Sequence, residues 1–272
     1  MRSALKRFVQ SAVKDSSLLI DRVRPPEPGI TILIYHRVGS GSGGEMDIAP
    51  GVFRDQMHSL RDTQRLLSLD QAADELSSGQ VVEPGVVVTF DDGTADWVDH
   101  VLPIIDECSI PTTFYVATKF IDDHEPFPQD GRPISWAGLH QLASHELVTI
   151  GSHTHRHLVF DRLDPRTASD ELRVCDELIE DHLGLTPTHF CYPKALPPSP
   201  DCAELVRRRY RTAVLAGTRA NPSGSDLQRL ARTPIQASDR GRHVRAKIAG
   251  GMGSEDRLRS VANRRRYRGV TT

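Results

Sequence analysis

One stretch decides the fold that we expect for this chain: Gly85-Val86-Val87-Val88-Thr89-Phe90-Asp91-Asp92-Gly93. Its apolar, mostly β-branched residues predict a buried strand that finishes in two adjacent carboxylates. Strand residues alternate faces, so Asp91 and Asp92 cannot do the same job unless the strand ends between them, where Gly93 allows a turn. We therefore predict a site here, in which one carboxylate holds a metal and the other handles a proton.

Strands and helices alternate along the rest of the chain. The pattern predicts strands over 30–35, 66–69, 86–90, 112–116, 147–150, 189–192 and 212–215, and helices over 50–63, 70–76, 96–108, 136–144, 165–183 and 201–208. Such alternation is typical of a parallel sheet, so we expect an α/β fold with the sheet closed or nearly closed into a barrel. In these barrels the chemistry gathers at the C-terminal ends of the strands.

Composition limits the function classes. The formal net charge of −2 over 272 residues argues against a nucleic-acid-binding protein, because phosphate binding needs a basic field. The four cysteines have no C-x-x-C spacing, which favours reduced, packed thiols. We find neither a signal peptide nor an apolar run of about 20 residues that could span a bilayer. A cytoplasmic or membrane-peripheral protein is therefore expected.

Three segments are predicted along the chain. Residues 1–28 form a basic amphipathic helix followed by a proline-rich linker, 29–250 form the main domain, and 251–272 form a basic tail. The first helix has Leu5, Phe8, Val9, Ala12 and Val13 at helical spacing, so it either packs on the body or contacts a membrane surface. The tail is either a solvated end or a site for an acidic lipid or polymer.

A cluster of histidines follows the predicted strand 147–150, in Gly151-Ser152-His153-Thr154-His155-Arg156-His157. His153 and His157 are four residues apart, so one turn or tight loop would point both imidazoles at one ion, with His155 facing elsewhere. Surface histidines would explain this pair alone equally well. With a carboxylate they form a two-histidine, one-carboxylate triad that leaves positions open for water and substrate. We assign Asp92 as that ligand and Asp91 as the general base.

Two further strand ends carry polar or aromatic residues. Tyr192 precedes Pro193 and is expected at the barrel mouth, where either its backbone N–H points into the site or its ring forms an aromatic wall. His36 follows the strand 30–35. A lone histidine there is usually structural, but a shared barrel would bring it to the reacting group.

These motifs together resemble the polysaccharide deacetylases of carbohydrate esterase family four. Thr89-Phe90-Asp91-Asp92-Gly93 is similar to the first family motif, His153 to His157 to the second, and Phe190-Cys191-Tyr192-Pro193 to the third. The similarity extends over 30–250. It implies a distorted (β/α)7 TIM-like barrel, a divalent metal on Asp92, His153 and His157, Asp91 as base, and the Tyr192 backbone amide as oxyanion stabiliser. Zinc is the first expectation for the metal, with cobalt, nickel or iron as alternatives.

Two departures from the common family pattern change the assignments. No late L-x-H histidine follows Thr212, and the early His36 instead resembles the circularly permuted branch that deacetylates extracellular poly-N-acetylglucosamine, so His36 inherits the general-acid role. The arginine that usually opens the third motif is replaced by Thr188-His189. Arg232, predicted on a later strand, is a candidate substitute, although an arginine beside a proline is more often at the surface.

The resemblance implies a metal-dependent hydrolase that removes N-acetyl groups from N-acetylhexosamine residues of a poly- or oligosaccharide. Trp136, Tyr192 and Arg232 are the predicted substrate-binding residues, since aromatic rings stack on sugars. Two alternatives are a non-carbohydrate amidohydrolase using the same site and an inactive glycan-binding domain. The intact set of acidic and histidine residues argues against the inactive domain.

Overall fold

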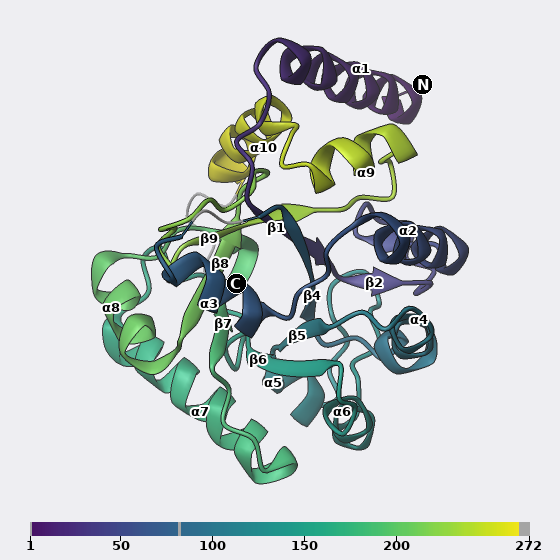
Figure 1. The fold of residues 1–272 in the computed structure, drawn as a ribbon. Helices are drawn as coiled ribbons and strands as arrows, with labels where there is room; N and C mark the ends of the chain where they lie inside the picture. The colour runs from purple at the N-terminus through teal and green to yellow at the C-terminus, as the bar shows by residue number, and fades with distance from the viewer. Residues whose placement is uncertain (1, 81–82, 267–272) are drawn as a thin grey trace.

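The chain forms a closed barrel of seven parallel strands, as expected from the alternating pattern (Figure 1). The computed structural model describes residues 2–80 and 83–266, with the side chains of 2–10, 195, 260 and 262–266 outside the description. In barrel order the strands are β1 (Ile30–Tyr35), β4 (Gly85–Asp92), β5 (Thr112–Val116), β6 (Val148–Ser152), β7 (His189–Cys191), β8 (Thr212–Ala216) and β9 (Leu230–Pro234), and β9 closes the barrel against β1. The predicted TIM-like barrel is thus confirmed.

One predicted strand is wrong. Residues 66–69 make only a single bridge, between Leu66 and Val86, and the seventh strand is β9. The side chains of Leu67 and Leu69 instead pack inside the barrel with Ile32 and Val87. Burial of these leucines, which a short apolar run does not distinguish from strand pairing, makes this segment a plug at the N-terminal end of the barrel.

Helices surround the barrel (Figure 1). They are α1 (Arg2–Val23), α2 (Pro50–Thr63), α3 (Leu69–Ser77), α4 (Leu102–Cys108), α5 (Thr118–Asp122), α6 (Trp136–Ala143), α7 (Pro165–Leu183), α8 (Pro200–Arg209), α9 (Gly241–Ile248) and α10 (Gly253–Arg266), with a π-helical turn over Trp97–Val101 and a 3-10 turn over Pro193–Ala195. A small parallel pair, β2 (Arg37–Val38) and β3 (Asp47–Ile48), lies outside the barrel.

Local sequence signals explain the helix ends. α7 begins with an Asp164 side chain that accepts from the Thr167 N–H and ends at Gly184, whose φ of 68° suits glycine. α3 begins one residue before the predicted 70–76, because the Ser68 side chain caps it by accepting from the Gln71 N–H. The helix predicted over 96–108 is divided into the π-helical turn and α4, since Pro103 has no N–H to donate four residues back.

The first and last helices lie together on one side of the barrel, beside α9 (Figure 1). α10 occupies most of the segment where we expected a solvated tail, and residues 267–272 with Arg268 lie outside the description, as do the side chains of Leu5, Phe8 and Val9. Among the described residues, no helix combines the length and hydropathy that crossing a bilayer requires. The boundaries of the three segments stay a prediction.

Candidate active site

The two aspartates are directed by an unusual backbone at the end of β4. β4 runs through Asp92, which pairs with Val116, so the strand does not end between the carboxylates as we had reasoned. Alternation alone would send Asp91 and Asp92 to opposite faces. Asp92 has φ 87° and Gly93 has φ 123°, and this left-handed turn brings the Asp92 carboxylate within 3.7 Å of His153.

The two histidines sit on the loop that leaves β6. Thr154 and His157 have φ values of 67° and 59°, so a tight loop, and not a helical turn, faces both imidazoles toward one point. Their ring centroids lie 4.8 Å apart at an interplanar angle of 74°. His155 points away and its Nδ1 contacts the Thr118 hydroxyl at 3.0 Å. Non-glycine residues in this backbone region store strain that recurs at functional sites.

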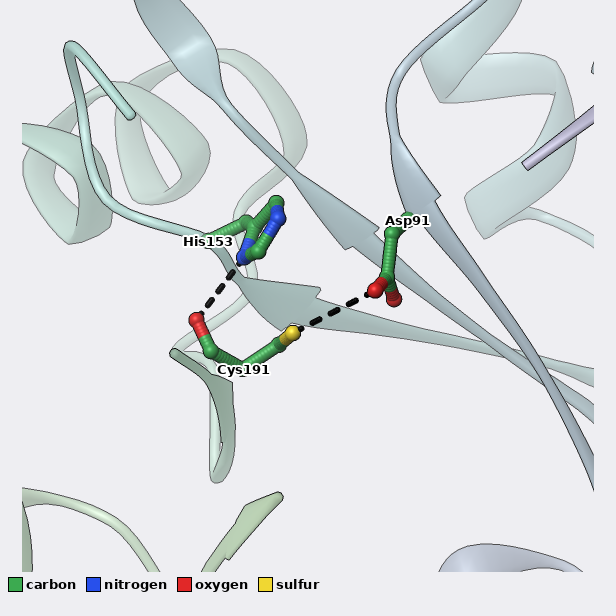
Figure 2. Close-up of side chains that lie close together, drawn as sticks. All are labelled: Asp91, His153 and Cys191. Atoms are coloured by element: carbon green, nitrogen blue, oxygen red, sulfur yellow. Dashed lines mark hydrogen bonds between the residues drawn. The ribbon is translucent and has the colours of Figure 1, made fainter. Parts of the chain in front are cut away.

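Asp92, His153 and His157 together fit a divalent metal. The Asp92 Oδ1 lies 3.7 Å from His153 Nε2 and 3.5 Å from His157 Nε2, so one ion could contact all three atoms. His153 Nδ1 lies 2.8 Å from the Cys191 carbonyl oxygen (Figure 2), which fixes the proton on Nδ1 and leaves the Nε2 lone pair for a ligand. The donor set of two imidazoles and one carboxylate suits zinc and related transition metals.

The charges and pKa values of these three side chains favour cation binding. Burial alone raises the pKa of Asp92, but the nearby histidines reverse the effect, and the net pKa is well below its usual range. Burial lowers the pKa of His157 to about 3, so its imidazole is neutral and able to bind a metal at neutral pH. Burial also lowers the pKa of His153, but the contacts with Cys191 and Asp92 outweigh it and raise the net pKa above 6.5.

A second group, of Asp91, His153 and Cys191, also brings three metal-ligating atoms close together (Figure 2). It is a poor cation site, because the Arg232 guanidinium lies 2.6–2.7 Å from both Asp91 oxygens and 2.8 Å from the Cys191 sulfur. Burial also raises the pKa of the Cys191 thiol, which disfavours a thiolate ligand. Of the two groups, Asp92, His153 and His157 are therefore the better candidates for holding a metal.

Arg232 reaches Asp91 from β9, which only β1 separates from β4 in the closed barrel. It lies on β9, its side chain is fully buried, and its two terminal nitrogens form a bidentate ion pair with the carboxylate. Thr89 accepts from the same guanidinium at 3.0 Å, and the Tyr115 ring lies 5.2 Å beneath it. Burial raises the pKa of Asp91, but Arg232 together with His153 and His36 outweighs it, so the net pKa is lowered and the carboxylate is ionised at neutral pH.

His36 joins the group from the end of β1. It is partly buried, and it is among the groups that lower the pKa of both Asp91 and Asp92. The His36 backbone carbonyl accepts from Trp97 Nε1 at 2.8 Å, and this bond holds the end of the strand. Its Nδ1 is buried and has no partner among the described residues.

Two of the three side chains predicted to contact substrate are buried away from any sugar. The Tyr192 ring is 1% exposed and packs against Phe160 and Phe190 outside the barrel, so it presents no face to a sugar. Strand alternation explains this, since Cys191 points inward and its two neighbours point outward. The Arg232 guanidinium is fully buried against Asp91, and the Trp136 ring stacks on His182 of α7 with centroids 4.0 Å apart. Substrate contact by Trp136 stays a prediction.

The Tyr192 backbone amide is also engaged. Its N–H donates to the Val214 carbonyl at 3.3 Å, in the ladder between β7 and β8. An oxyanion at this amide would have to replace that long bond, so the oxyanion role stays a prediction.

Sequence reasoning missed two residues that position the site. Cys191 was treated as a packed thiol, yet its carbonyl orients His153, and its inward position follows from the alternation Phe190-Cys191-Tyr192. Glu171 on α7 is 2% exposed and accepts from both the Arg156 backbone N–H and the Arg156 guanidinium, which pins the histidine loop. No short-range signal in the sequence links Glu171 to that loop.

Known proteins resemble this chain in sequence. The model of the family described as "Polysaccharide deacetylase" matches residues 78–208, which contain all three motifs. YxkH of Bacillus subtilis (strain 168), named as a polysaccharide deacetylase, is 25% identical over 191 residues; the match covers 68% of this chain and 63% of YxkH. This chain thus matches less than two thirds of that relative's length.

Solved structures have the same fold. IcaB from Ammonifex degensii superposes with a TM-score of 0.71 at 24% identity, over 82% of this chain and 97% of IcaB. The Streptococcus pyogenes deacetylase PplD, solved in complex with acetate, gives 0.70 at 18% identity over 82% of this chain and 99% of PplD. Since the family model, the shared barrel and the motif residues gathered at the strand ends agree, the matched segment of this chain, residues 78–208, belongs to the polysaccharide deacetylase family.

Proposed function

We propose that this protein is a metal-dependent hydrolase that removes N-acetyl groups from N-acetylhexosamine residues of a poly- or oligosaccharide. One observation carries the proposal: a candidate metal-ligand group, Asp92, His153 and His157, lies beside a separate carboxylate, Asp91, that is paired with Arg232. Amide hydrolysis needs both functions side by side.

The metal position supplies the electrophilic part of the reaction. A divalent ion held by Asp92, His153 and His157 would polarise the acetamide carbonyl and acidify a water molecule. The three side chains are suited to hold it because two are neutral or release one proton on binding, and the third is already anionic.

Asp91 is the proposed general base. Arg232 occupies one lone pair on each Asp91 oxygen, which fixes the carboxylate plane and keeps the group ionised. The remaining lone pairs can accept the proton of the attacking water. A low pKa makes Asp91 a weak base, so the proposal requires that the water be acidified in the same site.

His36 is the proposed general acid. The departing nitrogen must be protonated, because an amide anion is a very poor leaving group. His36 lies at the end of β1 and contributes to the low pKa of both aspartates, and its Nδ1 has no partner among the described residues, so the ring has a nitrogen free for proton transfer. The Tyr192 amide is the proposed oxyanion donor, on condition that its 3.3 Å bond to Val214 opens.

The substrate class rests on the family and on likeness. PplD is a deacetylase solved with acetate, which is the product expected here. The early position of His36, which resembles the circularly permuted branch of the family, supports an extracellular type of substrate such as poly-N-acetylglucosamine. A non-carbohydrate amide on the same site is the alternative.

Acetate release tests the proposal directly. The chain, loaded with zinc or cobalt, should release acetate from N-acetylglucosamine oligomers and bind one ion per chain, whereas simple acetamides should react far more slowly. Faster hydrolysis of simple amides would favour the alternative substrate, and binding of oligomers without acetate release from any glycan would indicate an inactive glycan-binding domain.

A further inference from the structure

The N-terminal helix α1 packs with its polar side inward. Lys14 Nζ lies 2.6 Å from Asp239 Oδ1, Ser17 Oγ lies 2.6 Å from Ser254 Oγ, and Asp21 Oδ2 accepts from the Met252 N–H at 2.7 Å. Residues 14, 17 and 21 share one helical face. An amphipathic helix of a globular protein normally buries its apolar face, so the opposite face of α1 needs explanation.

That opposite face exposes large apolar side chains. Leu19, Ile20 and Val23 are 59%, 47% and 81% exposed, and Leu258 and Val261 on the adjoining α10 are 60% and 53% exposed. These five residues account for most of the large exposed apolar side chains in the described part of the chain. Apolar surface concentrated on two adjacent helices marks an interaction site.

Four arginines line a cavity at the base of this surface. The cavity, of about 580 Å³, lies between the end of α1, the start of α10 and the segment 218–229, and its arginines are Arg24, Arg219, Arg229 and Arg257. None of the four forms an ion pair with a carboxylate of residues 2–80 or 83–266. All four are exposed.

Carboxylates at the same cavity are largely engaged elsewhere. Asp21 accepts from the Met252 N–H, and Asp226 lies 3.2 Å from Arg207, which leaves Glu27 as the remaining acidic side chain of the lining. The lining thus holds four arginines against three carboxylates, one of which is paired with Arg207, so the cavity carries a net positive charge.

We infer that this surface, formed by α1, α10 and the arginine-lined cavity, docks on a membrane rich in anionic phospholipids. The arginines would bind a lipid phosphate, and Leu19, Ile20 and Val23 would enter the acyl boundary, as in other interfacial helices. A second copy of the chain fits less well, because a twofold contact would bring the four unpaired arginines together. A soluble acidic polymer would leave the apolar side chains uncovered.

The arginine-lined cavity and the active site lie at opposite ends of the barrel strands. Asn221 of the cavity pairs with Ile30, the first residue of β1, at the level of Gly85, the first residue of β4. Asp92 is the last residue of β4, about 23 Å further along the strand at 3.3 Å per residue. A docked protein would therefore keep its substrate-binding end open to a glycan on the side away from the lipid.

Vesicle co-sedimentation of the full chain tests the inference. We expect the chain to bind vesicles of phosphatidylcholine mixed equally with phosphatidylglycerol, to bind more weakly as salt is raised, and to ignore vesicles of phosphatidylcholine alone. Arg24→Gln/Arg257→Gln should lower the partition coefficient about 25-fold, at roughly fivefold for each arginine. Leu19→Ser/Val23→Ser should lower it by at least about tenfold.

Matched variants provide the controls. Arg162→Gln/Arg166→Gln removes two exposed arginines from another part of the surface, and Leu185→Ser removes an exposed leucine; both should bind vesicles as the wild type does. Thermal unfolding should be unchanged in all these variants, and acetate release from soluble oligomers should match the wild type, so the outcome is independent of the proposed function. Equal binding to neutral vesicles, or equal losses in the control variants, would overturn the inference. So would binding of glycerol phosphate without vesicle binding, or a dimer that Leu19→Ser/Val23→Ser abolishes.

Discussion

Replacing Arg232 with methionine is the most informative single change at the site. It removes the guanidinium but retains most of the side-chain volume, and it leaves the Asp91 carboxylate buried without its counter-ion. The Asp91 side chain is 6% exposed and that of Arg232 is fully buried, with nitrogen to oxygen distances of 2.6 and 2.7 Å. Water therefore cannot replace the lost partner.

The expected magnitude follows from that burial. Removing one member of a buried ion pair costs about 3–5 kcal/mol, because the other charge remains desolvated. The pKa of Asp91 should rise, since burial is then no longer outweighed by Arg232. The folded-state pKa would exceed the unfolded value, so the loss should be full at neutral pH and should shrink as the pH falls and Asp91 takes up a proton.

Urea unfolding and acetate-release kinetics measure the two effects. Arg232→Met should lose about 3–5 kcal/mol at pH 7, and the acidic limb of its kcat/KM profile should move up by at least about one pH unit. The double variant Asp91→Asn/Arg232→Met should recover most of the stability without recovering activity. Arg232→Lys is the matched control, because it keeps the charge but cannot form the bidentate pair.

Either of two results would refute the reasoning about this pair. A loss below about 1 kcal/mol in Arg232→Met would mean that the pair contributes no more than an exposed ion pair. An unchanged acidic limb would mean that Arg232 does not control the ionisation of the group that limits activity.

Three further predictions concern the carboxylates and the metal position. Asp91→Asn should keep one metal ion per chain and lose about 10²- to 10⁴-fold in kcat, whereas Asp92→Ala should lose both metal and activity. Metal analysis and acetate-release assays measure the two effects, and an ion retained by Asp92→Ala would contradict the ligand set. The raised pKa of His153 means that a proton must leave this imidazole when a metal binds. The apparent affinity for the metal, measured by competition titration, should therefore increase about tenfold per pH unit between about pH 6 and pH 7. An affinity that does not change with pH would exclude that ionisation. Asp70 has a pKa lowered to about 2, by His189 first, so it should stabilise the fold above about pH 4 and lose this contribution toward pH 2. Because its side chain is 48% exposed, Asp70→Asn should cost only about 1 kcal/mol in urea unfolding at pH 7, and an equal cost at pH 2 would disprove the linkage.

The sequence by itself indicated an α/β barrel and identified the metal-ligand candidates. β-branched runs separated by amphipathic segments have periods that distinguish strand from helix, and the helices over 50–63 and 165–183 begin and end where the pattern predicts. The aspartate pair and the His153–His157 spacing are local features, so short-range reasoning finds them.

Tertiary structure decided what depends on contacts between distant segments. The role of 66–69 as a plug, the closure of the barrel by β9, and the Arg232–Asp91 pair join residues far apart in sequence, where hydrophobic periodicity carries no information on partners. The direction of Asp92 also depends on a left-handed turn that an aspartate adopts only when its surroundings hold it there. Sequence thus determined which chemical groups are available, and packing determined which of them come into contact. The reason is that alternation and spacing show which face of a strand or helix a side chain occupies, but not which other strand or helix packs against that face.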